Sequence, residues 1–169
     1  SGLIWKQKKL MPRVLISDAM DSIAEKILTS NKIDVDIKTD LNTDQLKDKI
    51  SEYDGLIIRS ATKVTKEIIE SAKNLKIIGR AGAGVDNIDL VSAKEKKIIV
   101  MNTPGGNTNA TAEHTLALLM SLSRKISKAD VSTHKGEWAK KKLKGNEIKG
   151  KTIGIIGFGN VGRRFAEIC

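Results

Sequence analysis

Three glycines, Gly157, Gly159 and Gly162, form a G-x-G-x-x-G pattern directly after the apolar run at residues 152–156. In a turn from strand to helix, the first glycine permits a sharp bend and the second lets a diphosphate approach the backbone. The third lets the helix pack closely on the strand. The anion then lies on the amides and the positive dipole end of a helix that begins near Asn160. The pattern predicts a nucleotide-binding turn, and a purely structural tight turn is the alternative.

Two arginines follow apolar runs that are typical of strands: Arg59 comes after residues 55–58, and Arg80 comes after residues 76–79. The carboxyl ends of parallel strands meet at one edge of the sheet, where open α/β sheets collect their ligands. Guanidinium groups beside glycine-rich backbone suit a small anion such as a carboxylate or a phosphate. Ordinary surface ion pairing accounts for the two arginines equally well on chemical grounds alone.

A third segment, residues 101–113, joins a strand to a long helix through Pro104, Gly105 and Gly106. Turn chemistry explains most of its composition. Its asparagines either cap the helix or bind a ligand, and their spacing does not decide between these roles.

The elements that must position these residues alternate along the chain from Arg13 onward. The expected strands span residues 14–17, 35–38, 55–58, 76–79, 98–101 and 152–156, and the expected helices span residues 22–30, 43–52, 66–73, 90–96 and 109–124. We interpret these strands as short apolar runs of the kind found in parallel sheets that are buried on both faces, and therefore expect every strand to be buried on both faces. Thr43 and Thr65 are the expected N-caps of two of the helices. The alternation predicts a doubly wound α/β fold.

Composition excludes several classes of protein. The 169 residues are 30% charged and contain no apolar stretch of about 20 residues, so we expect a soluble protein without a membrane span. The single cysteine, Cys169, excludes an internal disulfide, and no Cys/His cluster has zinc spacing. We therefore expect no metal and a reducing, cytoplasmic location. The net charge of +10 would attract nucleic acid, but scattered aromatic residues and few arginines favour a solvated surface instead.

The amino-acid composition changes along the chain and indicates where its parts begin and end. Residues 1–10 lack acidic side chains and precede Met11-Pro12, so we expect a tag or an upstream extension there. Residues 11–103 are expected to form one domain, residues 104–150 a long helix and a lysine-rich exposed connection, and residues 151–169 the start of a second α/β domain. A dinucleotide fold places its ribose-binding acid about 20 residues after the start of the glycine motif. We therefore expect these residues alone not to enclose a dinucleotide.

Five segments together resemble the D-2-hydroxyacid dehydrogenase family: LISDAM at 15–20, GLIIRSATKVT at 55–65, IIGRAGAGVDNIDL at 77–90, VMNTPGGNTNATAEHT at 100–115 and GEWAKKKLKGNEIKGKTIGIIGFGNVGR at 136–163. They stand in the family's order and cover nearly everything after residue 11. The resemblance implies a flavodoxin-like substrate domain with a parallel sheet, followed by the start of a Rossmann domain that binds NAD. It is strongest to members that oxidise 3-phosphoglycerate.

The resemblance also implies roles for individual residues. It assigns substrate binding to Arg59, Ser60, Arg80, Gly82 and Asn102, and contacts with NAD to Ala83, Gly157, Gly159, Asn160, Val161 and Gly162. Relatives are dimers or tetramers in which the lysine-rich arm lies near the dimer contact. We therefore expect a homodimer or homotetramer. One hypothesis is that Lys140 or Lys141 reaches the substrate phosphate of the neighbouring subunit, and plain solvated charge is the alternative.

The family's catalytic arginine, glutamate and histidine, with the histidine as proton acceptor, fall outside the part that these residues match. We therefore expect no catalytic residue and no turnover in this chain. His114 is expected to be packed or hydrogen-bonded, and His134 is expected to be exposed.

Three alternatives stay open. The intact protein could act on glyoxylate, hydroxypyruvate or lactate, which a panel of 2-hydroxy acids would reveal. It could be a corepressor-like relative that senses NAD and binds proteins, which would show cofactor binding without oxidation. It could bind nucleic acid through its charge, which a salt-titrated binding assay would detect. The choice between NAD and NADP also stays open, because the discriminating acid is not among these residues.

Overall fold

The computed structural model describes residues 11–169, so the expected tag or extension at residues 1–10 lies outside the described residues. The chain divides into two compact units, one ending at Pro104 and the other running from Gly105 to Cys169. The first unit carries the sheet, and the second unit is helical and contains the glycine turn.

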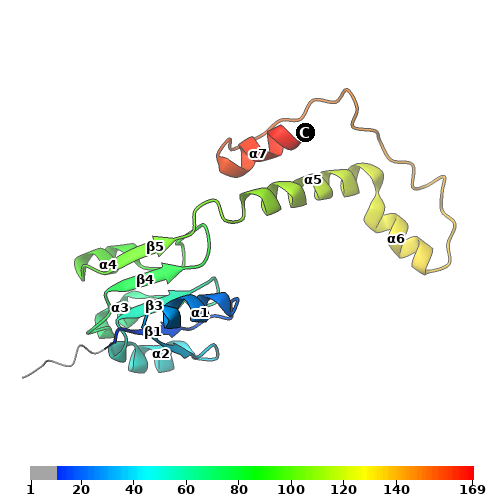
Figure 1. Cartoon of the computed structure of the whole chain (residues 1–169). Coiled ribbons are helices and arrows are strands. Elements are labelled where there is room, and N and C mark those ends of the chain that lie inside the picture. The colour runs from blue at the N-terminus through cyan, green and yellow to red at the C-terminus, as the bar shows by residue number, and fades with distance from the viewer. Residues whose placement is uncertain (1–10) are drawn as a thin grey trace, which may run out of the picture. The chain divides into compact units, whose positions relative to one another are not determined.

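The first unit is built on a parallel five-stranded sheet (Figure 1). Its strands are β1 (Arg13–Ile16), β2 (Asp34–Ile37), β3 (Gly55–Ile58), β4 (Ile77–Arg80) and β5 (Ile99–Asn102). Their order across the sheet is β2-β1-β3-β4-β5, the flavodoxin-like order, which has its switch point between β1 and β3. The predicted α/β class with a flavodoxin-like parallel sheet is therefore confirmed.

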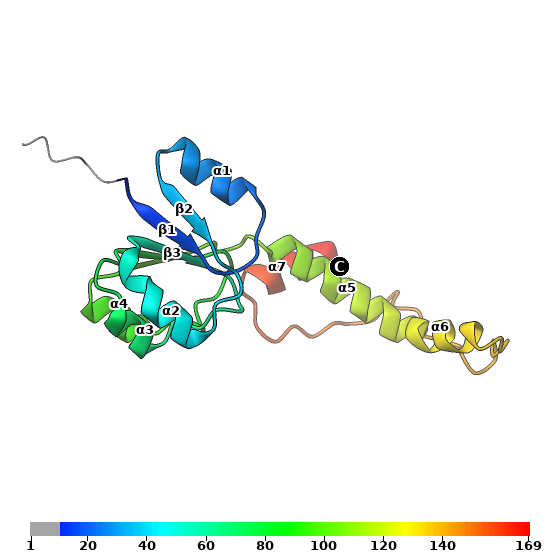
Figure 2. The ribbon, with the colours of Figure 1, turned by 90° about the horizontal axis from the view of Figure 1, so that it is seen from below.

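Helices lie on both faces of this sheet. Figure 2 shows α1 (Ile23–Ser30) on one face and α2 (Thr43–Lys49), α3 (Lys66–Ser71) and α4 (Leu90–Glu95) on the other. A 3₁₀ turn, Ile50–Glu52, follows α2, so the helix expected over 43–52 ends early. Strand side chains alternate between the two faces. The core lies under the layer of three helices, where it includes Leu15, Leu56, Ile58 and Ile78.

The opposite face of the sheet is less covered. The register pairs Ile77 with Ile99 and Gly79 with Met101 on this face. Ile99 is 60% exposed and Met101 is 54% exposed. The prediction that every strand is buried on both faces is wrong for β2, the edge strand in which Asp34 and Ile37 are exposed. It is also wrong for β5, the opposite edge strand. Among the described residues of this unit, α1 is the helix on this face, and it packs beside β2 at the far edge of the sheet. It therefore does not cover β5.

The N-cap of α2 differs from the prediction by one residue. Asn42, not Thr43, caps the helix: its side-chain oxygen accepts from the Gln45 amide at 2.9 Å, and its own amide donates to Gln45 Oε1 at 3.0 Å. This reciprocal capping box satisfies two donors that the helix leaves unpaired. Thr65 is the N-cap of α3 as predicted, although its side chain makes no capping hydrogen bond.

The second unit contains α5 (Thr108–Arg124), α6 (Ile126–His134) and α7 (Asn160–Ile168). Lys125 has a left-handed backbone with φ of 56°, and this residue separates α5 from α6, a helix that the pattern did not predict. Helix α7 packs along α5. The buried apolar side chains among the described residues of this unit are Ala112 on α5 and Phe165 on α7.

The strand expected at residues 152–156 is not formed. Ile156 is 104% exposed and Ile153 is 39% exposed. A parallel strand needs a neighbouring strand to pair its backbone N–H and C=O groups. The second unit offers none among the residues that the structure describes. The run has the composition of a strand, but composition supplies no hydrogen-bonding partner.

Candidate functional site

The two predicted arginines share one edge of the sheet. Arg59 directly follows β3, and Arg80 is the last residue of β4, one position further inside the strand than expected. Ile58 and Arg80 are paired in register, so both arginines lie at the carboxyl ends of neighbouring strands. Arg59 is exposed, and its Nη1 donates to the carbonyl oxygen of Ala19 at 3.2 Å. Most of its guanidinium donors stay available to a ligand, because a guanidinium carries five N–H groups.

Arg80 is held much more tightly than Arg59. Its side chain is only 12% exposed, and its Nη2 lies 3.6 Å from Asp86 Oδ1. Its Nη1 donates to the Gly84 carbonyl oxygen at 2.6 Å, and its Nε donates to the Arg59 carbonyl oxygen at 3.4 Å. Arg80 therefore ties the loop after β4 to the loop after β3, and only part of its guanidinium can meet a ligand.

The loop after β4 brings three further predicted residues to the same place. A Cβ on Gly82 would lie 3.0 Å from Arg80 Nη1, so glycine lets the arginine lie along the loop. Asn102, at the end of β5, donates through Nδ2 to the Ala83 carbonyl oxygen at 2.7 Å. Gly82, Ala83 and Asn102 thus lie together with Arg80, while the ligand that each would contact stays a prediction.

A carboxylate that the sequence pattern did not single out fills the switch point between β1 and β3. Asp18 is 5% exposed, and its Oδ2 accepts from the Arg59 amide at 2.6 Å. Its Oδ1 accepts from the Thr62 hydroxyl at 2.6 Å. Open α/β sheets bind ligands at such switch points, but here the chain's own carboxylate takes the position of an anion. Ser60, on the same loop as Arg59 and Thr62, is exposed. The sequence feature that could have pointed to Asp18 is its position two residues after the end of β1.

Hydrogen bonding keeps Asp18 ionised. Burial disfavours its charged form, but hydrogen bonds from the Thr62 hydroxyl and from the Arg59 and Thr62 amides outweigh burial. The pKa of Asp18 therefore lies below its ordinary value. Its oxygens are occupied by the loop after β3, so this carboxylate is not available to a substrate.

The glycine turn lies at the start of α7 in the second unit. Gly157 has φ of +90°, a conformation that other residues rarely adopt. Gly159 is the N-cap of α7, and a Cβ built there would meet no atom within 4 Å. A Cβ on Gly162 would instead collide with the carbonyl oxygen of Gly157. The third glycine thus lets the helix begin close to the turn, and the second leaves open space in front of the helix.

These residues fit a bound diphosphate. Gly159 supplies no side-chain cap to the first turn of α7, and the Asn160 side chain accepts from Arg163 Nη2 at 3.0 Å. Val161 and Gly162 are partly buried in that first turn. Amides left unpaired at a helix N-terminus favour an anion there, and the open space at Gly159 gives it room.

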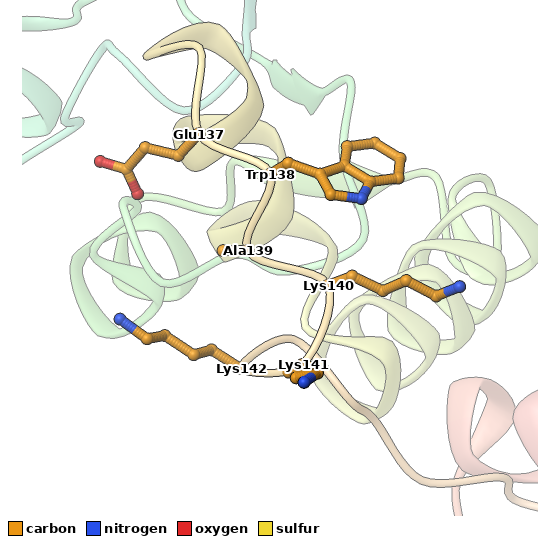
Figure 3. Close-up of a pocket in the computed structure, with 6 residues that line it drawn as sticks. All are labelled: Glu137, Trp138, Ala139, Lys140, Lys141 and Lys142. Atoms are coloured by element: carbon orange, nitrogen blue, oxygen red, sulfur yellow. The ribbon is translucent and has the colours of Figure 1, made fainter.

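The lysine-rich segment of the second unit forms a shallow cavity of about 490 Å³ at residues 137–142. Figure 3 shows Trp138 and Lys140 pointing to one side of the backbone, and Glu137 and Lys142 pointing to the other. Trp138 is 87% exposed, and Lys140 and Lys141 are exposed as well. This surface can attract an anion through its ammonium groups.

The histidines and the cysteine do not form a reactive group. His114 is exposed, which contradicts the expectation of a packed or hydrogen-bonded side chain, because α7 covers only part of the surface of α5. His134 is exposed as expected, with Nδ1 3.3 Å from Asp130 Oδ1. Cys169 is exposed and free. Within residues 11–169, no cluster of three or more potential ligands could hold a metal. Over the same residues, no helix is long and apolar enough to cross a membrane.

A flavodoxin-like sheet with arginines at its carboxyl edge, together with a dinucleotide-type glycine turn, is typical of nucleotide-dependent α/β enzymes. The catalytic-domain model of the D-isomer specific 2-hydroxyacid dehydrogenases matches residues 14–160. The chain belongs to the D-isomer specific 2-hydroxyacid dehydrogenase family.

Similar proteins include members with different substrates. The chain is 45% identical over 157 residues to D-3-phosphoglycerate dehydrogenase from Archaeoglobus fulgidus, covering 93% of this chain and 30% of that protein. It is 49% identical over 156 residues to hydroxypyruvate reductase from Thermotoga maritima, covering 92% of this chain and 51% of the relative. A solved NAD⁺-bound 3-phosphoglycerate dehydrogenase from Entamoeba histolytica has a TM-score of 0.74 and 33% identity, covering 94% of this chain and 50% of that chain. The chain thus spans from under a third to about half of the length of these relatives.

Proposed function

We propose that the intact gene product oxidises the 2-hydroxyl of 3-phosphoglycerate with NAD⁺ and forms 3-phosphohydroxypyruvate. The observation that carries this proposal is the pair Arg59 and Arg80 at the carboxyl ends of adjacent strands, beside the glycine-rich loop after β4. Two guanidinium groups at one sheet edge suit a small acid with several negative charges better than a neutral substrate. The likeness to the Archaeoglobus fulgidus enzyme supports the choice of a phosphorylated substrate.

In this proposal each residue at the edge has a distinct task. Arg59, whose guanidinium is the freer of the two, binds the substrate carboxylate, and the Ser60 hydroxyl donates to the same group. Gly82 contributes through its lack of a side chain, because its amide already donates to the Arg80 carbonyl oxygen at 2.9 Å. Arg80 adds positive charge from its fixed position, and Asn102 holds the loop by its bond to Ala83.

The phosphate of the substrate is proposed to meet a second subunit. Lys140 or Lys141 of a neighbouring copy supplies the cation, which makes the intact protein a homodimer or a homotetramer. Support comes from the exposure of both lysines and of Trp138, an apolar side chain that an interface would cover.

NAD is proposed to lie with its diphosphate on the amides at the start of α7, against Gly157, Gly159, Asn160, Val161 and Gly162. NAD supplies the hydride acceptor of the reaction. We place the protein in the cytoplasm, since its single cysteine suits a reducing compartment.

The test is NADH formation by the intact gene product with 3-phosphoglycerate. Arg59→Ala should raise KM by at least about tenfold, because a charge-assisted bond to the carboxylate is lost. Lys73→Ala, which removes an exposed charge after α3, should leave KM unchanged. Lys140→Ala or Lys141→Ala should raise KM for the phosphorylated acid. Absence of NADH with every 2-hydroxy acid, or an unchanged KM in Arg59→Ala, would refute the proposal.

Hydroxypyruvate is the second candidate substrate, because the chain is 49% identical to the Thermotoga maritima reductase. A panel of 3-phosphoglycerate, glycerate, glycolate and lactate separates the two candidates. A higher kcat/KM for glycerate than for its phosphorylated form would favour the hydroxypyruvate reaction, and Lys140→Ala would then have no effect.

A further inference from the structure

Arg59 and Ser60 lie on a loop without regular secondary structure, residues 59–62 between β3 and the isolated bridge at Val64. Surface loops of this kind are usually mobile. A ligand that orders such a loop binds less tightly, because the loop loses conformational entropy. Hydrogen bonds from outside the loop oppose that mobility here. They reach the loop from two distant parts of the chain, one on its amide side and one on its carbonyl side.

Asp18 holds the amide side of the loop. Its carboxylate accepts from the Arg59 amide at 2.6 Å, from the Thr62 amide at 3.1 and 3.2 Å, and from the Thr62 hydroxyl at 2.6 Å. The Ser17 hydroxyl lies 3.0 Å from the same Thr62 hydroxyl oxygen. Bonds to a buried carboxylate are about twice as strong as bonds between neutral groups. The two ends of the loop are therefore joined through one side chain.

Asn87 holds the carbonyl side of the same loop. Its Nδ2 donates to the Arg59 carbonyl oxygen at 2.8 Å and to the Thr62 carbonyl oxygen at 2.6 Å. The Asn87 main chain is fixed as well, since its carbonyl oxygen accepts from the Val64 amide at 2.8 Å. Both backbone groups of Arg59 and both of Thr62 are thus bound by the same pair of side chains.

We propose that Asp18 and Asn87 are positioning residues that hold Arg59 and Ser60 ready to bind the substrate anion. The inference rests on the proposed function for the identity of the ligand, but the order of the loop can be measured without any ligand. Neither side chain is free to bind the substrate. The Asp18 oxygens and the Asn87 amide hydrogens are bound to the loop, and the unpaired Asn87 Oδ1 is buried. They raise the affinity because the loop is already ordered before the ligand binds, so that binding loses less conformational entropy.

Two substitutions on the amide side test the proposal in the 169-residue chain. Asp18→Asn puts a donor where the carboxylate accepts, and Thr62→Val removes the hydroxyl while keeping the shape of the side chain. Thr62→Ser keeps the hydroxyl and serves as the conservative variant. Asp54→Asn is the matched control, because Asp54 also accepts from a backbone amide and a side chain, Arg13 and Lys76, away from this loop. Circular dichroism first establishes that each variant is folded.

The first readout is the NMR order parameter of the Ser60 and Ala61 amides, which lie between the two held residues. We expect rigid values of about 0.85 in the wild type, Thr62→Ser and Asp54→Asn, and values below about 0.6 in Asp18→Asn and Thr62→Val. The second readout is the Kd for 3-phosphoglycerate. It should rise about tenfold or more in Asp18→Asn and Thr62→Val and stay unchanged in the other two variants.

The two readouts separate the two proposals. If the wild type binds neither 3-phosphoglycerate nor any other 2-hydroxy acid, the proposed function fails, and the order parameters alone judge the positioning role. Unchanged order at Ser60 and Ala61 in Asp18→Asn overturns that role. A rise in Kd that is equal in Asp18→Asn and Asp54→Asn overturns it too, because a general loss of stability then explains both.

Discussion

The three glycines of the turn before α7 should respond differently to the same small change, a glycine-to-alanine substitution. Gly162→Ala places a methyl group against the Gly157 carbonyl oxygen, 3.2 Å from its carbonyl carbon and 3.4 Å from Ile155 Cγ2. Gly159→Ala places it in open space, with no atom within 4 Å. The first change should damage the local fold, and the second should damage only the binding of a diphosphate.

The size of each effect follows from these contacts. The group that meets the new methyl of Gly162→Ala is backbone, which cannot rotate away, and overpacking of this kind costs about 1–3 kcal/mol. Helix α7 has only 9 residues and depends on packing around Phe165, so its first turns should fray. Gly159→Ala should change stability by less than about 0.5 kcal/mol. Its methyl group would keep a diphosphate off the amides, and one lost charge-assisted hydrogen bond of about 1.5–3 kcal/mol weakens NAD binding about ten- to a hundredfold.

Two assays separate the effects. Circular dichroism and urea unfolding of this chain report the helix, and calorimetric titration of the intact gene product with NAD reports the cofactor. Gly79→Ala is the control for both, because its methyl group would make only an ordinary contact, 3.8 Å from Ile57. Full NAD affinity in Gly159→Ala would refute the assignment of the open space to a diphosphate. Wild-type helicity and stability in Gly162→Ala would refute the close-packing account of the third glycine.

Three further predictions concern the stability of the first unit. Tyr53→Phe should lower the free energy of unfolding in urea by about 1–2 kcal/mol, because the buried hydroxyl donates to Asp36 Oδ2 at 2.7 Å. An unchanged free energy would mean that this hydrogen bond is no more favourable than the bonds that the two groups make to water in the unfolded chain. The Tyr53 hydroxyl lowers the pKa of Asp36, and Lys76 lowers the pKa of Asp54. The two carboxylates therefore contribute stability above about pH 4, and this stability is lost as pH falls through their folded pKa values. Unfolding titrations from neutral to acid pH should show this loss, and Asp54→Asn should make it shallower; a parallel decline would contradict the assignment. Ile78 is 0% exposed, and Ile78→Ala should lower the free energy of unfolding in urea by about 2–5 kcal/mol. Ile99 is 60% exposed, and Ile99→Ala should lower it by less than about 1 kcal/mol. Equal losses in the two variants would contradict the assignment of the sheet faces.

Much of the fold could be predicted because the strands are short runs of β-branched residues between helical segments. The runs at residues 14–17 and 55–58 lie within one position of β1 and β3. Spacing along the chain does not fix the order of strands across a sheet, so the flavodoxin-like order came from the resemblance to a family. The run at residues 152–156 marks the limit of this reasoning, because a strand also needs a neighbour to pair with.

The candidate site could be predicted only where its residues follow a strand directly. Arg59 and Arg80 satisfy that condition, and the structure brings both to one edge of the sheet. Asp18 also stands close to the end of a strand, but its role and that of Asn87 could not be predicted, because they reach the loop across separations of 41 and 28 residues along the sequence. Local patterns do not report contacts of that range, which arise only once the strands are assembled.

The two arginines at this edge act on the site in different ways. Arg80 commits its donors to the carbonyl oxygens of Gly84 and Arg59, and its side chain is only 12% exposed. Arg59 keeps most of its donors, while its own peptide groups are held by Asp18 and Asn87. A guanidinium that is free at its tip and fixed at its backbone loses little conformational entropy when an anion binds. In the proposed site, Arg80 therefore supplies rigidity and Arg59 supplies recognition of the anion. An edge with two equally mobile arginines is expected to bind the same anion less tightly.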